Sequence, residues 1–537
     1  MNDVVCVAFI VQRFSNERPI VFVRRSEGES VQVDLAELSS FTLPIVTHDT
    51  NLLVETFRLN GLMLPETLID IAESLRLRSQ ISKDQGGPKH WIPWRVGKDY
   101  FEDRADAQTL ERLFQASIVP PTLQELDRLA AAAASALHLL WAEIVEDLKR
   151  LGEWARFHEK EVPVQQIFHQ RQYRGVRIDA SHLSGYIRSC EQEKFSQFRK
   201  LSARLGFSPI GLKPAQIADR LFEISSDLPD SLKGTDALED QLEISKEKSE
   251  TAFGLLTYIK ASRDLSVLRQ LQTCKERAYP FFQVHGTVTS RILVAEPRLQ
   301  QLRKRYRALI AADEGMTLAY LDYAQFEPGI LAHLSGDAAL LAAYANSDLY
   351  LTLSREIYGD EHARDIAKKI FLAYCYGMSR SKIALLLAGA NPSSIALNEC
   401  ELAVTQFFAR FPSIEEYRCI VQEELRNKGV VGSKMGNYRK RTGEGSLSTK
   451  ELRWAMNQSV QGTASLIFKE ALIGLSAMFG HQSILLPMHD AVLLQFDANV
   501  ISREQFESQA IEIMRSSFLR YCPRIVPKVT NASFDAV

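Results

Sequence analysis

The stretch MTLAYLDYAQFEPGILAHLSG, residues 316–336, predicts a buried strand that runs directly into a helix. Asp322 lies at the end of this apolar strand, where a carboxylate is costly to bury unless it is paired or bound to a metal. Asp490 lies in a similar setting, beside His489 in the two-residue turn of an apolar hairpin predicted for residues 483–496, SILLPMHDAVLLQF. Taken singly, each aspartate is more simply interpreted as a turn residue. As a pair on separate strands, they offer the hard oxygen ligands that two Mg²⁺ ions prefer, which makes metal-assisted phosphoryl transfer a candidate chemistry.

The composition is that of a globular protein with several domains. Of its 537 residues, 46% are apolar and 24% are charged, which allows a large buried core. No apolar run is long enough to span a bilayer, and the first residues lack the basic start and cleavage site of a secretory signal, which predicts a cytoplasmic location. The seven cysteines form no CxxC pair, so neither a zinc ribbon nor a disulfide framework is indicated. The net charge of −2 gives no general basic excess of the kind typical of DNA-binding proteins, although basic residues cluster at 303–307 and 434–441.

The patterns along the chain change from mixed to helical. Residues 1–115 combine short apolar strands with polar turns and a helix, which is typical of an α/β domain. Residues 122–151 are rich in Ala and Leu and contain no Gly or Pro, which predicts a long helix. Helices predominate further on, the first of them with Asp179 as its expected cap. A hairpin with Gly436-Asn437 at its turn is predicted within residues 430–441.

The segment that begins at Asp322, DYAQFEPGILAHLSGD, resembles motif A of the bacterial DNA polymerase I family, also called family A. The resemblance implies that Asp322 binds both metal ions and that Tyr323 offers its backbone carbonyl to them. It also implies that Glu327 crowds the sugar 2′ position and so rejects ribonucleotides. Gln325 is then expected near the incoming nucleotide.

The segment RDIAKKIFLAYCYG resembles motif B, the finger helix of the same family. Arg364 and Lys368 are four residues apart and project from one helix face, where a cationic pair can grip a triphosphate. Tyr376 follows about two turns later and can stack on a base. An exposed amphipathic helix is the more frequent explanation of such a pattern in general. Two departures suggest altered nucleotide handling, because Leu372 replaces an aromatic residue that senses the sugar and Tyr350 replaces a histidine that contacts the triphosphate.

The segment PMHDAVLLQF resembles motif C, in which His489 and Asp490 match and Ala491 replaces a usual carboxylate. Further segments resemble the start of the thumb and two stretches that contact primer-template DNA. Six motifs in family order over residues 165–537 make coincidence improbable. The residues implied to contact DNA are Thr289, Arg291, Gln300, Arg453, Asn457, Gln461 and His489. Three of them recur every four residues on one predicted helix, where side chains can donate to the acceptors that all base pairs present in the minor groove.

The family has a proofreading 3′–5′ exonuclease domain of the ribonuclease H-like type before the thumb, which needs four carboxylates to hold two metals. The first strand here, VVCVAFIVQRF, contains no acidic residue. Asp49 is the nearest match to the second carboxylate position. Arg104 stands at or beside the expected last aspartate, between Asp103 and Asp106. We therefore expect an exonuclease-like α/β domain that is inactive, and no 5′ nuclease domain.

The resemblance predicts an α+β, multidomain, right-hand polymerase fold with palm, fingers and thumb. The expected boundaries are 1–115 for the exonuclease-like domain, 116–160 for a helical connection and 161–284 for the thumb. The palm is expected in two parts, 285–346 and 451–537, with the fingers between them at 347–450. The expected activity is template-directed extension of a primer 3′-hydroxyl with dNTPs, in replication or repair, by a monomer that uses two Mg²⁺ ions for which Mn²⁺ can substitute.

Two alternatives stay open. Leu372, Tyr350 and Ala491 suggest a catalytically impaired, polymerase-like DNA-binding protein. A nuclease acting through the N-terminal region is the other alternative, and its missing carboxylates weigh against it.

Overall fold

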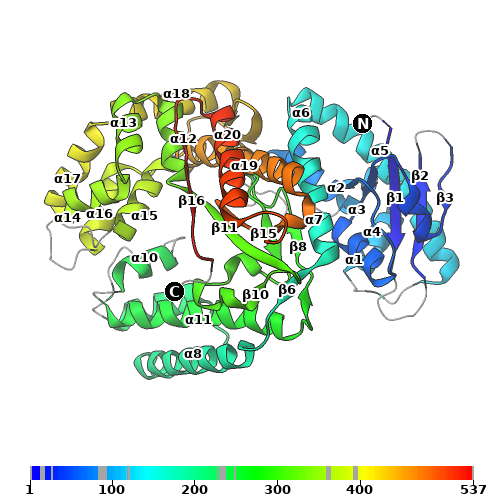
Figure 1. Ribbon diagram of the computed structural model, residues 1–537, viewed down its shortest axis with the longest axis horizontal. Coiled ribbons are helices and arrows are strands. Elements are labelled where there is room, and N and C mark those ends of the chain that lie inside the picture. The colour runs from blue at the N-terminus through cyan, green and yellow to red at the C-terminus, as the bar shows by residue number, and fades with distance from the viewer. Residues whose placement is uncertain are drawn as a thin grey trace.

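A smaller N-terminal body lies beside a larger one in the computed structural model (Figure 1). The structure describes residues 3–534 except 12–17, 26–27, 83–92, 116–117, 119–120, 226–227, 229–237, 247–248, 359–363 and 391–396. One of the polar turns expected within residues 1–115, at residues 15–17 between the first two strands, therefore lies outside the described residues.

The N-terminal body is built on a five-stranded sheet with the order β3-β2-β1-β4-β5. Alternate residues of the central strand β1 enter two different cores: Cys6 and Ala8 pack on the side of the long helix α5, whereas Val7 and Phe9 pack with α1. Because both faces of β1 are buried, its sequence is continuously apolar instead of alternating. The elements are β1 (Val5–Ile10), β2 (Ile20–Arg24), β3 (Val31–Gln32), β4 (Ile45–Thr47), α1 (Thr50–Leu59), β5 (Leu68–Asp70), α2 (Ile71–Ser79), α3 (Pro93–Val96), α4 (Arg104–Phe114) and α5 (Leu123–Arg150).

A helical arm, interrupted by a short turn at residues 151–153, joins the two bodies. It starts with α5, which confirms the long helix predicted from the alanine-rich stretch and begins in a capping box of Thr122 and Glu125. The arm continues through α6 (Trp154–Arg156), a π-helical turn at Phe157–Glu161 and α7 (Val162–Arg174). Helix α7 packs against α1 on one side and against α19 (Thr449–Phe479) of the larger body on the other.

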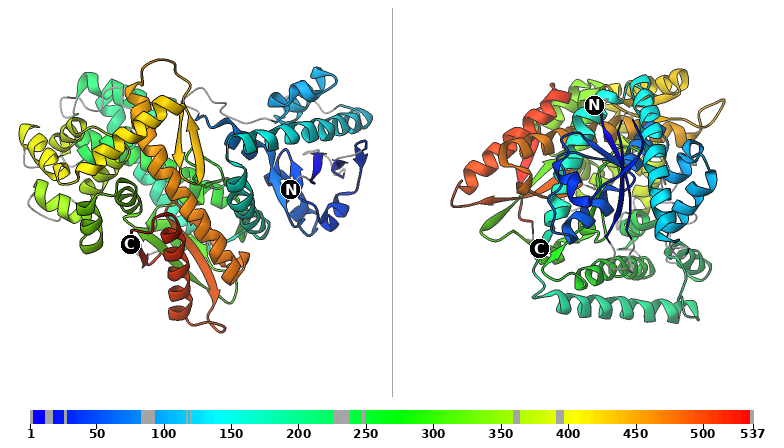
Figure 2. Two further views of the ribbon diagram at one scale, coloured as in Figure 1. Left: turned by 90° about the horizontal axis from the view of Figure 1, so that it is seen from above. Right: turned by 90° about the vertical axis from the view of Figure 1, so that its right-hand side faces the viewer.

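The larger body is centred on an antiparallel sheet with the order β14-β15-β11-β16. Helices α19 and α20 run along this sheet (Figure 2). The hairpin predicted at residues 483–496 is confirmed, because Met488 pairs with Ala491 across a two-residue turn. The elements are β11 (Met316–Ala324), α12 (Phe326–Ser335), β14 (Ile484–Met488), β15 (Ala491–Asp497), α20 (Arg503–Tyr521) and β16 (Lys528–Asn531).

Two helical groups flank the central sheet. The long antiparallel pair α8 and α11 lies below it in Figure 1, and the block from α13 to α18 lies at its other side. The first group comprises α8 (Leu183–Leu205), α9 (Pro214–Ile224), α10 (Leu238–Ser245) and α11 (Glu250–Gln272); the second comprises α13 (Ala338–Asn346), α14 (Leu349–Tyr358), α15 (Arg364–Cys375), α16 (Arg380–Ala390), α17 (Leu397–Ala409) and α18 (Pro412–Lys428). Short strands connect these parts: β6 (Val176–Ile178), β7 (Arg277–Ala278), β8 (Phe281–Gln283), β9 (Leu293–Ala295), β10 (Ile310–Ala311), β12 (Val430–Ser433) and β13 (Gly436–Lys440).

Two local expectations were wrong. The turn of the second hairpin is formed by residues 434 and 435, and Gly436-Asn437 already belongs to β13, because Ser433 pairs with Gly436. Asp179 does not cap a helix: its carboxylate accepts from Ser181 N at 2.9 Å, and α8 begins later, at Leu183. In both cases a local turn formed a residue or two away from the position that the sequence pattern favoured.

Although no apolar run was expected to be long enough to span a bilayer, helices α5 and α19 meet that criterion by length and composition alone. In the most apolar 18-residue window of each, 56% and 67% of residues respectively are buried inside the protein. Both serve as core helices here, one against the N-terminal sheet and the other against the central sheet.

Candidate active site

The two aspartates singled out by the sequence meet at one end of the central sheet. Strands β11 and β15 pair antiparallel with Asp322 opposite Ala491, so the turn residue Asp490 falls beside the end of β11. The amide of Tyr323 donates a hydrogen bond to the carbonyl of Asp490 at 3.2 Å. His489, with φ of 63°, has the left-handed backbone that two-residue hairpin turns favour at their first position. The register of the sheet therefore fixes the two aspartates as neighbours.

Electrostatics at this pair favours a cation. Burial raises the pKa of Asp490 to about 8, and the negative charges of Glu327 and Asp322 add to that effect, while Arg291 and Lys368 oppose it. Burial also raises the pKa of Asp322, with Lys368 as the largest opposing charge. Two crowded carboxylates that resist ionisation gain most when a divalent cation neutralises them.

The donor set at the pair fits Mg²⁺. Two carboxylates and the nearby backbone carbonyls supply hard oxygen ligands, and Mg²⁺ keeps water and phosphate in the rest of its shell. Within the described residues, no group of three or more His, Cys, Asp or Glu side chains is arranged to hold a metal without such additional ligands.

Glu327 joins three distant segments next to the aspartates. It lies in the first turn of α12 and is 3% exposed. One of its carboxylate oxygens accepts from the Tyr376 hydroxyl at 2.8 Å and from the Arg291 guanidinium at 2.7 Å. The same Arg291 lies 3.8 Å from a carboxylate oxygen of Asp490. Glu327, Tyr376 and Arg291 thus form one rigid, hydrogen-bonded wall beside the aspartate pair.

The cationic pair of α15 divides its roles. Lys368 contributes a favourable charge to both aspartates. Arg364 instead donates two hydrogen bonds, of 2.7 and 3.0 Å, to one oxygen of Asp348 and lies over the ring of Tyr350 at 5.4 Å. Asp348 was not recognised from the sequence as part of this site.

The other residues expected to contact the nucleotide differ in how exposed their side chains are. Tyr350 is 3% exposed, and burial raises the pKa of its hydroxyl well above the usual range. Leu372 is only half-buried on α15. Gln325 has its side-chain oxygen engaged by the amide of Leu349 at 3.0 Å, so it anchors α14 beside the site.

The residues expected to contact DNA differ in how far their side chains are already hydrogen-bonded within the protein. The Thr289 hydroxyl donates to Gln461 on α19 at 3.0 Å, which places that loop against the helix. Arg453 is exposed on the same helix, and the Asn457 side-chain oxygen finds no hydrogen-bond partner among the described residues. Gln300 differs, because its amide donates to the carbonyls of residues 292 and 487 and accepts from residue 294, which counts against a direct contact with DNA.

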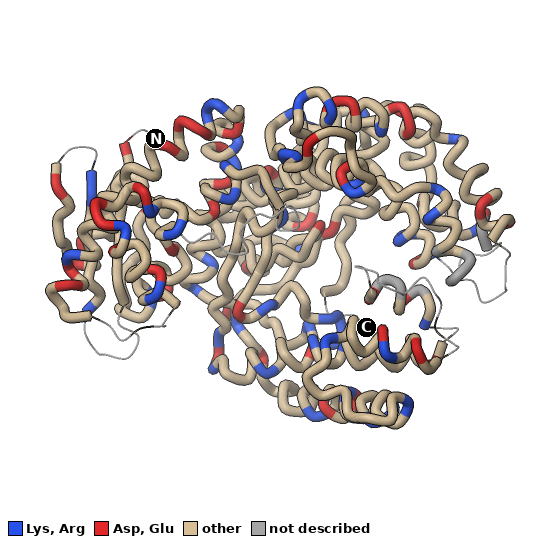
Figure 3. The backbone as a smooth tube through the Cα atoms, turned by 180° about the vertical axis from the view of Figure 1, so that it is seen from behind, with Lys and Arg blue, Asp and Glu red and all other residues tan. Residues whose placement is uncertain are grey.

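A cavity of about 180 Å³ opens between the loop of Thr287 to Leu293 and the hairpin turn. Its polar lining comes from Arg291, His489 and Asp490 together with Thr287, Ser290, Gln300 and Ser465, and Phe326 and Phe468 supply part of its apolar lining. The site therefore combines a recess with charged groups at its rim, next to the aspartate pair. Basic and acidic positions are otherwise interspersed over the whole chain (Figure 3), in keeping with its small net charge.

The carboxylates considered for a nuclease have structural partners in the N-terminal body. Asp49 caps α1 by accepting from Leu52 N at 2.9 Å, and Asp103 caps α4 in the same way. Asp106 forms two hydrogen bonds, of 2.6 and 2.8 Å, with Arg128 on α5. Strand β1, as described, carries no acidic residue. The expectation of an inactive exonuclease-like domain thus stays a prediction, with these partnerships in its favour.

Residues 207–529 match the family model described as DNA polymerase family A. Curated relatives include DNA polymerase I of Helicobacter pylori, 26% identical over 415 residues that cover 70% of this chain and 45% of the relative. DNA polymerase I of Aquifex aeolicus is 24% identical, with 68% and 63% covered, and the thermostable DNA polymerase I of Thermus aquaticus is 26% identical, with 69% and 47% covered. The chain spans about half the length of the curated relatives it matches.

A solved structure is similar over almost the whole chain. It is the POL domain of Pol1 from M. smegmatis in complex with DNA primer-template and dNTP. The TM-score is 0.75 at 20% identity, and the match covers 99% of this chain and 96% of that one. This likeness in fold confirms the expected α+β right-hand architecture.

Proposed function

Because the chain belongs to DNA polymerase family A, we propose that it extends the 3′-hydroxyl of a primer with dNTPs on a DNA template. The observation that carries the proposal is the meeting of Asp322 and Asp490 at one end of the central sheet, beside the wall of Glu327, Tyr376 and Arg291. A carboxylate pair with cations on both sides suits phosphoryl transfer, in which catalysis is mostly positioning and charge stabilisation.

Each part of the site has a role in this proposal. Two Mg²⁺ ions held by Asp322, Asp490 and the backbone carbonyl of Tyr323 would activate the primer hydroxyl and neutralise the leaving pyrophosphate. Lys368 and Arg364 grip the triphosphate, for which Arg364 exchanges its bond to Asp348 for phosphate oxygens.

The sugar and the DNA are assigned to neighbouring groups. Glu327 bounds the sugar 2′ position, since its two hydrogen bonds hold its carboxylate in place. Arg291 and His489 line the recess and face the primer end. Arg453 and Asn457 near the start of α19, together with the loop at Thr289, are assigned to the minor groove. Primer-template DNA and dNTPs are thus the proposed partners, and a monomer in the cytoplasm is the proposed state.

The domain boundaries expected from the sequence are part of the proposal. Residues 161–284 correspond to the thumb, 347–450 to the fingers, and 285–346 with 451–537 to the palm. Residues 1–115 correspond to an exonuclease-like domain without activity, joined through the connection at 116–160.

Primer extension tests the proposal. A 5′-labelled primer-template is incubated with dNTPs or rNTPs and Mg²⁺, and the wild type is compared with Asp322→Ala. Asp497→Asn, at the opposite end of β15, is the matched control. We expect extension with dNTPs, its loss in Asp322→Ala and its retention in the control. A wild type that binds the primer-template but never extends it, with Mg²⁺ or Mn²⁺, would contradict the proposal.

A DNA-binding protein without catalysis is the second candidate. The bond between Arg364 and Asp348 favours it, because it occupies one of the two cations expected on the triphosphate. Binding without extension in the same assay would support this candidate. Shortening of the primer in the absence of dNTPs would instead reveal a nuclease in the N-terminal body.

A further inference from the structure

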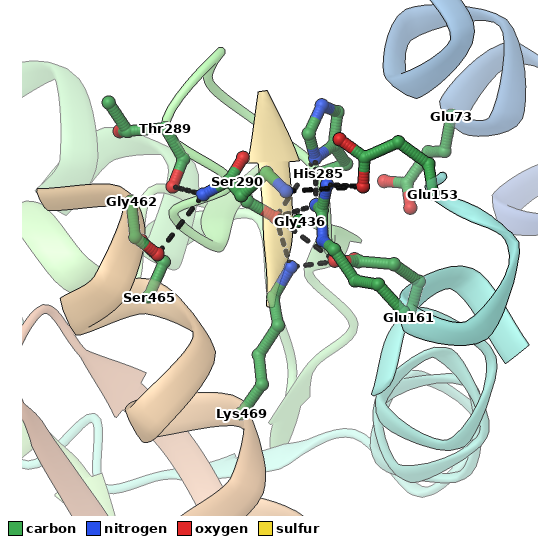
Figure 4. Close-up of polar contacts among 12 residues, drawn as sticks. Glu73, Glu153, Glu161, His285, Thr289, Ser290, Gly436, Gly462, Ser465 and Lys469 are labelled. Atoms are coloured by element: carbon green, nitrogen blue, oxygen red, sulfur yellow. Dashed lines mark hydrogen bonds and ion pairs between the residues drawn. The ribbon is translucent and has the colours of Figure 1, made fainter. Parts of the chain in front are cut away.

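A buried cluster of charged and polar groups lies where the helical arm meets the central body (Figure 4), and one of its members, Ser290, also lines the cavity of the candidate site. We name it the junction cluster; its members are Glu153, Arg156, Glu161, His285, Ser290 and Lys469. None of them is more than 5% exposed. Three come from the arm, two from the loop that follows β8 and one from α19. Sequence reasoning missed the cluster, although a lysine within the apolar run ASLIFKEALIGL was a visible signal.

The hydrogen bonds of the cluster converge on Ser290. Lys469 donates to Glu161 at 2.6 Å and to the Ser290 hydroxyl. Arg156 donates to Glu161 at 2.7 Å and to the Ser290 hydroxyl at 2.8 Å. The His285 ring lies 2.9 Å from the same hydroxyl oxygen. A single serine side chain is therefore held from the arm, from α19 and from its own loop.

The backbone of Ser290 explains why it needs such anchoring. Its φ of 65° lies in the left-handed region, which residues other than glycine rarely adopt without a compensating contact. Ser290 is also fully buried, so the surrounding groups determine its conformation. Its two neighbours in the chain are Thr289, which is bonded to Gln461, and Arg291, which is bonded to Glu327 and lies near Asp490.

The arm holds the opposite side of this loop as well. Glu153 accepts from the amides of Asn437 and Tyr438 at 3.1 and 2.8 Å. The Asn437 side chain in turn donates to the carbonyl of Thr289 at 2.9 Å. Gly436 has a φ of 99°, a backbone conformation that favours glycine, and a Cβ there would lie 2.8 Å from a Glu153 oxygen, so that the Glu153 side chain would have to shift.

The positive and negative charges of the junction cluster are equal in number, but stabilising the fold is not its main role. Glu153 and Glu161 face Arg156 and Lys469, so the buried charges sum to zero. Buried ion pairs are weak sources of stability, because desolvation offsets most of their attraction. What such a network provides is a unique geometry for the groups bonded to it.

We propose that Ser290 and Lys469 are positioning residues for nucleotide addition, which fix the loop of residues 287–291 so that Arg291 meets Glu327 and Asp490. The inference rests on the proposed polymerase function. It gives the helical arm a role in the polymerase reaction: through Arg156 and Glu161 the arm supports the loop that faces the primer end.

The test compares two cluster variants with a matched control. Ser290→Ala removes one hydroxyl, and Lys469→Met removes the α19 charge with little change in length. Lys160→Met is the control, since Lys160 also joins the arm to α19, through an ion pair with Glu470, but contacts none of the loop residues. Single-nucleotide incorporation gives kcat and the KM for dNTP, and amide exchange reports the mobility of residues 286–291.

We expect both cluster variants to lower kcat at least about tenfold, because small misplacements of catalytic groups have effects of that size. The KM for dNTP stays within about threefold, since the triphosphate contacts are elsewhere. Exchange at residues 286–291 accelerates in both variants and not in the control. Ser290→Ala keeps the test decisive if Lys469→Met fails to fold.

Two results would overturn the inference: wild-type kcat in Ser290→Ala, or an equal loss of kcat in Lys160→Met. The wild-type rate is measured first and reports on the polymerase function itself. Failure of the proposed function therefore shows in the wild type, and failure of this inference shows only in the comparison among variants.

Discussion

Replacing Asp490 with asparagine should stabilise the metal-free protein while abolishing primer extension. The wild-type carboxyl has a pKa raised from 3.8 to about 8, because burial and the charges of Glu327 and Asp322 disfavour its ionised form. In the unfolded chain this carboxyl ionises near pH 4, whereas in the native protein it stays protonated up to about pH 8. The free energy of unfolding of the wild type therefore falls as pH rises from about 4 to about 8. Asparagine has nearly the same shape and carries no charge, so the free energy of unfolding of Asp490→Asn should not fall over this pH range.

The expected magnitude follows from the size of the shift. Four pKa units correspond to at most about 6 kcal/mol at pH 9. Since 29% of the Asp490 side chain is exposed and the repulsion is shared with Asp322 and Glu327, we expect about a third of that value, ~2 kcal/mol. Such a gain raises Tm by about 2–4 °C per kcal/mol in a domain of ordinary size.

The assay is thermal and urea unfolding of the wild type and Asp490→Asn at pH 5 and pH 9, with EDTA or with Mg²⁺. The variant should be more stable at pH 9 in EDTA, and Mg²⁺ should stabilise the wild type more, because ligand binding to the native state alone adds to its stability. Asp497→Asn, which makes the same change at the far end of β15, should shift stability by no more than about 0.5 kcal/mol. A variant no more stable than the wild type at pH 9, or an equal effect of Mg²⁺ on both, would refute the reasoning.

Two further predictions concern buried carboxylates. Glu327→Ala should raise the kcat/KM for rNTPs relative to dNTPs at least about tenfold, since it removes the carboxylate that Tyr376 and Arg291 hold beside the sugar. An unchanged ratio in primer extension would show that Glu327 does not exclude ribonucleotides. Glu73→Gln should stabilise the N-terminal body increasingly from pH 4.5 to about 8, because burial, and after it the Asp70 charge, raises the Glu73 pKa from 4.5 to about 8; equal Tm values for variant and wild type at pH 9 would contradict this.

Several features of the site followed from the sequence because they depend on local pattern. The apolar runs on either side of His489 and Asp490 permit little except a hairpin, and its register then fixes where Asp490 lies. Strand β11, which carries Asp322 near its end, is similarly determined by its own residues. Spacing on a helix placed Arg364 and Lys368 on one face in the same way.

The hydrogen-bond partners of polar side chains were not predictable from such patterns. Arg364 is bonded to Asp348, and Gln300 uses its whole amide inside the protein, although their sequence contexts only indicated a triphosphate and a DNA contact. Likewise, the turn of the β12–β13 hairpin lies two residues before the expected position, and the Asn437 amide is bonded to Glu153 of the helical arm, 284 positions away. Partners this far apart in the chain leave no periodic signal.

The sequence by itself determined the strands, the long helices, the aspartate pair and the resemblance in motif order, because each depends on residues close together in the chain. Only the tertiary structure decided which buried charges meet. Lys469 and Glu161 are 308 residues apart, and their bond to Ser290 exists because the helical arm packs against α19. Hydrophobic periodicity fixes which face of an element is buried, whereas the partner of a buried charge is fixed by the packing of several elements at once.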